Sequence, residues 1–169
     1  MGEWDVQSGS GIRFEGGPAG AGRLATEAAC LVTVDVLSFT TAVSVAVDRG
    51  IRVLSLRWPG GLAVEDGRGG AAQAAAAYAR RPGARPAAHR HAVTPDTPWS
   101  LSPAHLRAAP FVARRVLPSP NGAAIAAAAP SGVQVLAACL RNLTAVGNWL
   151  TSRNYGTPER PVAVIAAGE

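Results

Sequence analysis

The chain has 169 residues, of which 48% are hydrophobic, so it suits one folded domain and is excluded from the intrinsically disordered class. Its 16 basic residues, all arginine, outnumber 11 acidic residues and give a formal net charge of +5, which favours anionic partners. The N-terminus lacks the pattern of a signal peptide, and no apolar run approaches the roughly eighteen residues of a membrane span. Both cysteines lie inside apolar runs without a CxxC partner, as is typical of reduced thiols. We therefore expect a cytoplasmic protein with no membrane partner.

The first part of the chain predicts alternating strands and short helices. Residues 6–17, punctuated by glycine, indicate a hairpin or an edge strand. The continuous apolar run at 30–36, interrupted by Thr33 and Asp35, predicts a strand covered on both faces. The other expected elements here are a short helix at 18–28, a helix at 40–48, a strand at 51–57 and an Ala-rich helix at about 70–80.

Residues 81–110 are rich in proline and arginine, hold all three histidines and show no clean periodicity. We expect a long loop region with short elements, of the kind that covers a site. Beyond it the alternation resumes, with strands at 112–118, 133–140 and 161–166 and helices at 122–129 and 143–153.

This alternation predicts a single α/β domain over residues 1–169, built as a three-layer α/β/α sandwich with a mostly parallel sheet. The chain ends directly after an apolar run, which is an unusual place for a domain to stop. We therefore expect the N-terminal part of a longer protein, truncated at its C-terminal side.

Polar residues follow four of the apolar runs, at the point where each predicted strand ends. Ligands of parallel α/β sheets bind outside the carboxyl ends of the strands, so these residues predict one shared site. They are Asp35, Ser38, Thr40 and Thr41, then Ser119, Asn121 and Gly122, then Arg141 and Asn142, and finally Gly168 and Glu169.

Asp35 is the most informative of these residues, because a carboxylate in an apolar strand is costly unless it is paired, metal-bound or protonated. It could bind a divalent cation or act as a general base or nucleophile, or it could cap the next helix or pair with an arginine. Hydroxyls and free N–H groups at the helix starts suit phosphate, although capping explains each of them alone. Together they favour a shared anion site.

The segments VTVDVLSFTTAVSVAVDRG, the SP of WSLSP, LPSPNGAAIAAAA, AACLRNLTAVGNWL and VAVIAAGE, in this order and at comparable spacing, resemble the 2-phosphosulfolactate phosphatase family. The resemblance covers most of 30–56 and 99–169. It implies a three-layer α/β fold and Mg²⁺-dependent hydrolysis of phosphate monoesters of 2-hydroxycarboxylic acids. The named member of this family acts in coenzyme M biosynthesis, and the family continues beyond this point with an acidic segment.

The resemblance also implies roles for individual residues. Ser38 stands where the family usually has arginine, and Arg141 is a candidate to replace that guanidinium. The expected catalytic residues are Asp35, Asn121 and Asn142, the expected phosphate-binding residues are Ser38, Thr40, Thr41, Ser119, Gly122 and Arg141, and the expected Mg²⁺ ligands are Asp35 and Glu169.

Two other functions stay open from the sequence. Ser38 and the early end of the chain motivate a non-catalytic relative that binds a small anionic ligand. The positive charge motivates nonspecific nucleic-acid binding, but the basic stretch from Arg80 to His91 has no interleaved aromatic residues for base stacking. Nucleic acid is therefore not favoured as a partner, whereas a homo-oligomer remains open.

Overall fold

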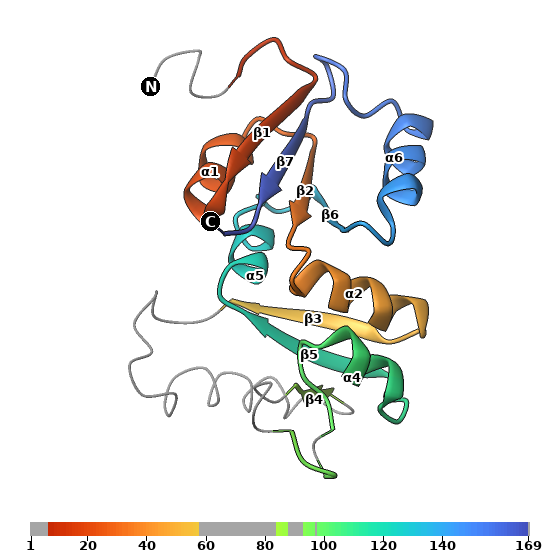
Figure 1. Cartoon of the computed structure of the whole chain (residues 1–169). Coiled ribbons are helices and arrows are strands. Elements are labelled where there is room, and N and C mark those ends of the chain that lie inside the picture. Colours follow the sequence, from red (N-terminus) through yellow and green to blue (C-terminus); the bar gives the residue numbers. More distant parts are fainter. Residues whose placement is uncertain (1–6, 58–83, 88–92, 97, 169) are drawn as a thin grey trace.

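Strands and helices alternate along the described chain (Figure 1). The computed structural model describes residues 7–57, 84–87, 93–96 and 98–168. The strands are β1 (Ile12–Gly16), β2 (Cys30–Val34), β3 (Arg52–Arg57), β4 (Ala84–Pro86), β5 (Arg114–Ser119), β6 (Gln134–Ala138) and β7 (Val162–Ala166). The helices are α1 (Gly17–Leu24), α2 (Phe39–Asp48), α4 (Pro103–Ala108), α5 (Gly122–Ala126) and α6 (Leu143–Ser152).

The described strands form two parallel sheets. One has four strands in the order β1-β7-β2-β6, and the other has three in the order β3-β5-β4. Helices α2 and α5 lie between the sheets and contact strands of both (Figure 1). The chain passes through α2 from β2 of the first sheet to β3 of the second, and it returns to the first sheet at β6. The α/β class with parallel strands is confirmed, whereas the single three-layer sandwich is not.

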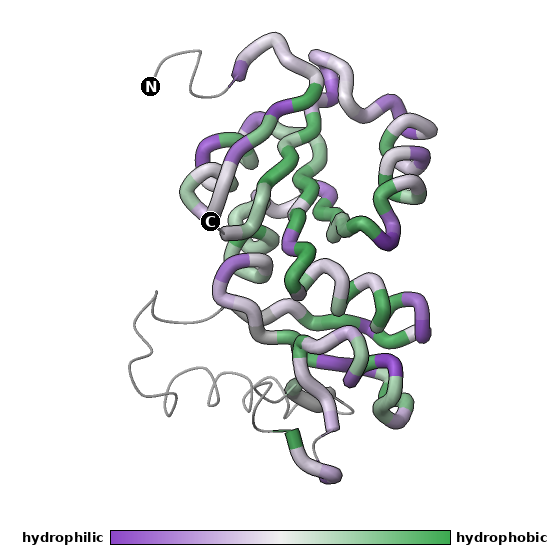
Figure 2. The backbone as a smooth tube through the Cα atoms, viewed as in Figure 1, coloured by the Kyte–Doolittle hydropathy of each residue, from purple (hydrophilic) through white to green (hydrophobic). Residues whose placement is uncertain are grey.

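The four-stranded sheet aligns the ends of three strands that carry predicted site residues. Val34 of β2 is level with Ala138 of β6 and Ala166 of β7, so the residues that follow emerge at one edge. Strand β2 lies between these neighbours and is almost wholly buried, in keeping with its apolar sequence. Figure 2 shows hydrophobic backbone segments running through the centre of this sheet.

Helices cover the two faces of the four-stranded sheet. On one face, α1 and α5 pack with β2 and β7 in a cluster that includes Leu24, Leu31, Ile125 and Ile165. On the other face, α6 contributes Val146 and Leu150 to a cluster around Val32 and Val162 of the sheet. Since α6 has no fully buried residue, its side of the sheet is the less completely covered one.

Most predicted elements are present within a few residues of their expected bounds. Within residues 6–17 the strand is β1, which pairs in parallel with β7, so the edge strand is confirmed and the hairpin is not. Helix α5 ends at Ala126, short of the expected residue 129 and ahead of Pro130. The described parts of 81–110 hold two short elements, β4 and α4, as expected.

The helix expected at about 70–80 lies outside the described residues. Among the helices that the structure does describe, none is long and apolar enough to cross a bilayer.

Candidate functional site

Asp35 directly follows β2 and is held in the turn that leads into α2. Its Oδ1 accepts the Phe39 N–H at 3.3 Å, and the Thr40 hydroxyl donates to the Asp35 carbonyl at 2.7 Å. The Asp35 N–H in turn donates to Thr40 Oγ1 at 3.0 Å. No basic side chain pairs with Asp35 in the described part of the chain. Burial raises the pKa of the Asp35 carboxyl above its usual range, and the Phe39 N–H only partly opposes this.

Helix α5 brings the end of β5 against Asp35. A methyl group on Gly122 would lie 2.3 Å from Phe39 Cδ1 and 2.9 Å from Asp35 Oδ2. Only a residue without a side chain allows this approach, which explains glycine at the first position of α5. The Gly122 N–H donates to the buried Ser119 Oγ at 3.0 Å, which fixes the turn between β5 and α5.

The end of β7 completes the cluster. The Ala167 N–H donates to the Val34 carbonyl at 2.8 Å, which extends the pairing of β7 with β2 past the last strand residue. A methyl group on Gly168 would lie 3.1 Å from Asn121 Nδ2, so the Asn121 amide contacts the end of β7. Glu169 lies outside the described residues. We call Asp35, Asn121, Gly122 and Gly168 the Asp35 corner.

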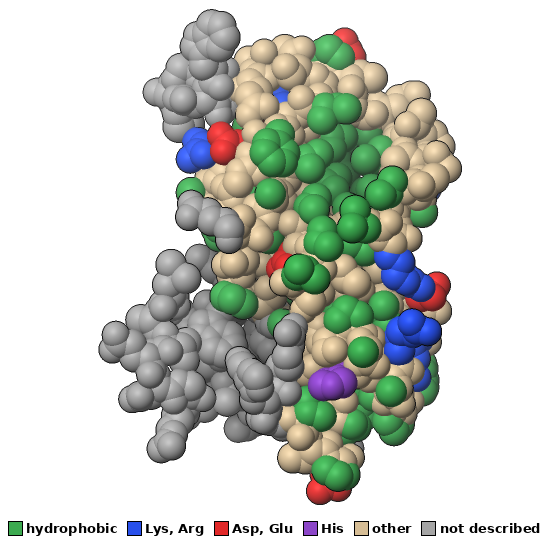
Figure 3. Space-filling view, viewed as in Figure 1, with side chains coloured by type: hydrophobic (Ala, Val, Ile, Leu, Met, Phe, Trp, Pro, Cys, Tyr) green, Lys and Arg blue, Asp and Glu red, His purple; other side chains and the backbone are tan. Residues whose placement is uncertain are grey.

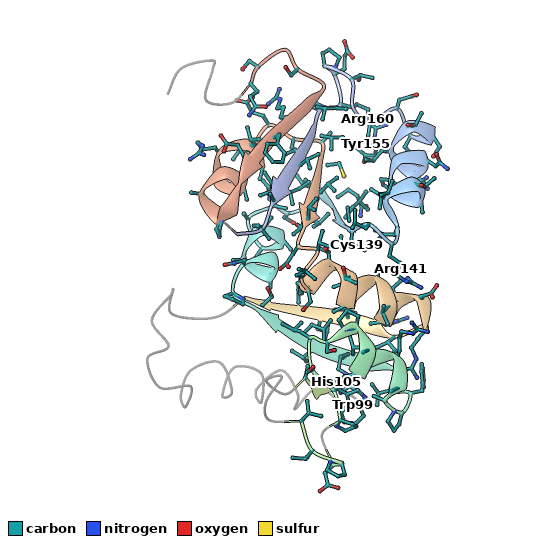
Figure 4. The ribbon with its side chains drawn as sticks, in the orientation of Figure 1. Trp99, His105, Cys139, Arg141, Tyr155 and Arg160 are labelled. Carbon is teal, nitrogen blue, oxygen red and sulfur yellow. The ribbon has the colours of Figure 1, made fainter. Side chains whose placement is uncertain are left out.

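The polar residues that follow β6, Arg141 and Asn142, have their partners outside the Asp35 corner. Arg141 donates from one guanidinium nitrogen to Ser44 Oγ at 2.9 Å and from another to Asp48 Oδ2 at 2.6 Å. Both partners lie in the second half of α2, and Figure 4 shows Arg141 beside that helix. Asn142 Oδ1 accepts the Cys139 N–H at 2.8 Å, and its Nδ2 donates to the Ala137 carbonyl at 3.0 Å. The Asn142 bonds brace the turn from β6 to α6, and within the described residues neither side chain hydrogen-bonds to the Asp35 corner.

The hydroxyls after β2 also have local partners. Ser38 Oγ donates to the Leu101 carbonyl at 3.0 Å, and Thr41 Oγ1 donates to the Val36 carbonyl at 2.7 Å. The first amides of α2 are engaged as well, since the Thr40 N–H donates to the Asp35 carbonyl at 2.9 Å. These bonds hold the turn itself, so a phosphate bound to these groups would have to displace the carbonyl oxygens that they already contact.

Sequence reasoning missed the aromatic wall of the corner. Phe39 is buried in a cluster with Leu106, Leu117 and Ala123, and Trp99 and Leu101 pack against that cluster. Phe39 stands within the SFTT string, between hydroxyl side chains that match the predicted site. The available signal was its large apolar side chain at the first position of a helix, where it can only point into the core.

The oxygen donors of the corner fit a magnesium ion only in part. Within the described residues, no three His, Cys, Asp or Glu side chains gather closely enough to hold a metal. Mg²⁺, however, is commonly held by one or two carboxylates, with water and substrate phosphate oxygens completing its shell. Asp35 Oδ2, which accepts no hydrogen bond from a described residue, is an oxygen that could serve as one such ligand.

No family model, curated protein or solved structure matches the chain. The similarity to the 2-phosphosulfolactate phosphatase family therefore remains a prediction from the motifs.

Proposed function

We propose that the chain is a Mg²⁺-dependent phosphatase, or part of one, that hydrolyses phosphate monoesters of 2-hydroxycarboxylic acids of the 2-phosphosulfolactate type. The supporting observation is the Asp35 corner, where three of the four predicted strand ends meet around a partly buried carboxylate with a raised pKa. The proposal places the protein in the cytoplasm and gives it a small phosphorylated anion as its substrate.

In this proposal the residues of the corner have different roles. Ionised Asp35 would bind the metal through Oδ2, and the Asn121 amide would donate a hydrogen bond to a phosphoryl oxygen. A bound Mg²⁺ supplies positive charge that stabilises the phosphoryl oxygens and lowers the pKa of coordinated water. Arg141 and Asn142 take no part, because their hydrogen bonds hold them at α2 and at the turn after β6.

The test is the release of phosphate from 2-phospholactate with and without Mg²⁺. We expect Asp35→Asn to lower the rate by at least about a hundredfold, since it removes the ionisable oxygen but keeps an acceptor for the Phe39 N–H. Asp96→Asn, at an exposed position away from the corner, serves as the matched control and should behave as wild type. Activity that survives Asp35→Asn, or that is indifferent to Mg²⁺, would contradict the proposal.

One observation favours a second candidate, a non-catalytic relative that binds a small anion. The hydroxyls of Ser38, Thr40 and Thr41 already donate to backbone carbonyls, and no guanidinium pairs with Asp35 among the described residues. Calorimetry with 2-phospholactate separates the two candidates. Binding without any turnover in the presence of Mg²⁺ would select the non-catalytic one.

A further inference from the structure

A hollow lies at the far end of α2 from the Asp35 corner. It is open to solvent on one side, and its volume is about 440 Å³. Its lining comes from three separate parts of the chain, namely the second half of α2, helix α4 and the loop after β6. The lining residues are Val45, Asp48, Arg49, Arg107 and Arg141.

The lining of the hollow has a net positive charge, because it includes three arginines and one aspartate. Figure 3 shows basic side chains and an acidic one together on the edge of the molecule formed by α2 and α4. A guanidinium offers a planar fork of N–H donors that matches the oxygens of phosphate and carboxylate groups. Several such groups around one hollow therefore suit an anion with more than one charged group.

Two of the three arginines are held in place by the protein. Arg49 donates to the Leu106 carbonyl of α4, and Arg141 donates to Ser44 and Asp48 of α2. Arg107 is exposed and has no hydrogen-bond or ion-pair partner within the part of the chain that the structure describes. The hollow thus combines two positioned cations with a third that is free to close on a ligand.

Helix dipoles explain the positions of only two of the three arginines. Arg49 and Arg107 stand at the C-terminal ends of α2 and α4, where a positive charge is favourable. That explanation does not extend to Arg141, which reaches the same hollow from the turn after β6. Arg107 and Arg141 are exposed, yet all three arginines line one surface hollow, and this convergence is the feature that indicates a ligand.

We propose that this hollow binds a small organic polyanion that carries two or more phosphate or carboxylate groups. The site is separate from the Asp35 corner, because Asp48 ends the ten-residue helix that Phe39 begins, and such a helix is about 15 Å long. The inference therefore stands apart from the proposed phosphatase activity. Asp35→Asn, which tests that activity, should leave binding in the hollow unchanged.

The experiment is calorimetric titration of the full chain with inorganic pyrophosphate and, in a second arm, with citrate. Tighter binding of pyrophosphate indicates a phosphate ligand, and tighter binding of citrate indicates a carboxylate ligand. We expect Arg107→Gln to weaken binding roughly tenfold, because it removes a charged donor. Asp48→Asn should strengthen binding several-fold, because it removes the carboxylate that competes for Arg141.

The matched control is Arg23→Gln, which removes an equal charge from α1 on the other side of the molecule, where Arg23 pairs with Glu15. It should change the affinity by less than about twofold, since a distant exposed charge is screened by salt. The proposal is overturned if neither anion binds at millimolar concentration or if Arg107→Gln and Arg23→Gln weaken binding equally. Weaker or unchanged binding in Asp48→Asn would contradict a site that contains Arg141. Circular dichroism confirms that each variant is folded.

Discussion

At the scale of single residues, the ionisation of Asp35 makes the free energy of unfolding depend on pH. Because burial raises its pKa in the folded state, the folded protein holds more protons than the unfolded one between the ordinary aspartate pKa and the raised value. The free energy of unfolding should therefore fall as pH rises through that window. Asp35→Asn cannot ionise, so its stability relative to wild type should grow over the same window. Urea unfolding of both proteins across a pH series measures this, and a difference that does not vary with pH would contradict it.

A second residue, Thr33, makes an independent prediction about the core. It is only 1% exposed, and its hydroxyl has no hydrogen-bond partner among the described residues. Thr33→Val replaces an unsatisfied hydroxyl by a methyl group and should raise the free energy of unfolding by about 1 kcal/mol. Thr33→Ser keeps the hydroxyl, loses the methyl group and should lower it by about 1 kcal/mol. Destabilisation by Thr33→Val would show instead that the hydroxyl binds an ordered water in the adjoining cavity of about 200 Å³.

At the scale of elements, the approach of α5 to the end of β2 depends on one glycine. A side chain at Gly122 would collide with Phe39 and Asp35, so Gly122→Ala should lower the free energy of unfolding by about 1–3 kcal/mol and also reduce any activity at the corner. Gly147 is the control, because it lies inside α6 and a methyl group there meets nothing within 4 Å. Gly147→Ala should stabilise the protein by up to about 1 kcal/mol. Equal effects of the two substitutions in urea unfolding would refute the close contact.

At the scale of the whole molecule, β1 forms one edge of the four-stranded sheet, and among the described strands it pairs only with β7. Gln7 covers part of this edge, because its side-chain amide accepts the Phe14 N–H at 2.9 Å and donates to the Phe14 carbonyl at 2.7 Å. Ile12 and Phe14 are 67% and 62% exposed there, and Figure 3 shows hydrophobic side chains spread over the neighbouring sheet. An edge strand with exposed apolar side chains promotes association where its backbone is left unprotected.

Gln7→Ala should therefore speed hydrogen exchange of the Phe14 amide by roughly five- to tenfold and increase concentration-dependent self-association. Exchange measured by NMR and sedimentation velocity report the two effects. Ser8→Ala, at the exposed neighbouring position, should change neither of them. If both variants behave as wild type, Gln7 does not protect the edge.

The amino-acid sequence by itself determined the kinds of element and most of their bounds, and it singled out Asp35 as a candidate site residue. These features are local, since apolar periodicity, turn residues and a charge inside an apolar run are readable over a few neighbouring positions. The predictions for β2, α2, β5 and α6 agree with the structure for this reason.

Only the tertiary structure decided which strand ends meet. Pairing between strands depends on contacts between distant segments, and the packing of α2 and α5 between the sheets separates β3, β4 and β5 from the other strands. As a result, Gly122 approaches Asp35 from the end of the second sheet and Asn121 approaches Gly168. Arg141, which follows the neighbouring strand β6, instead pairs with Asp48. Whether a strand end joins a site depends on where the next helix packs. Helix packing is set by apolar contacts between segments that are distant in the sequence, so the local sequence does not predict it.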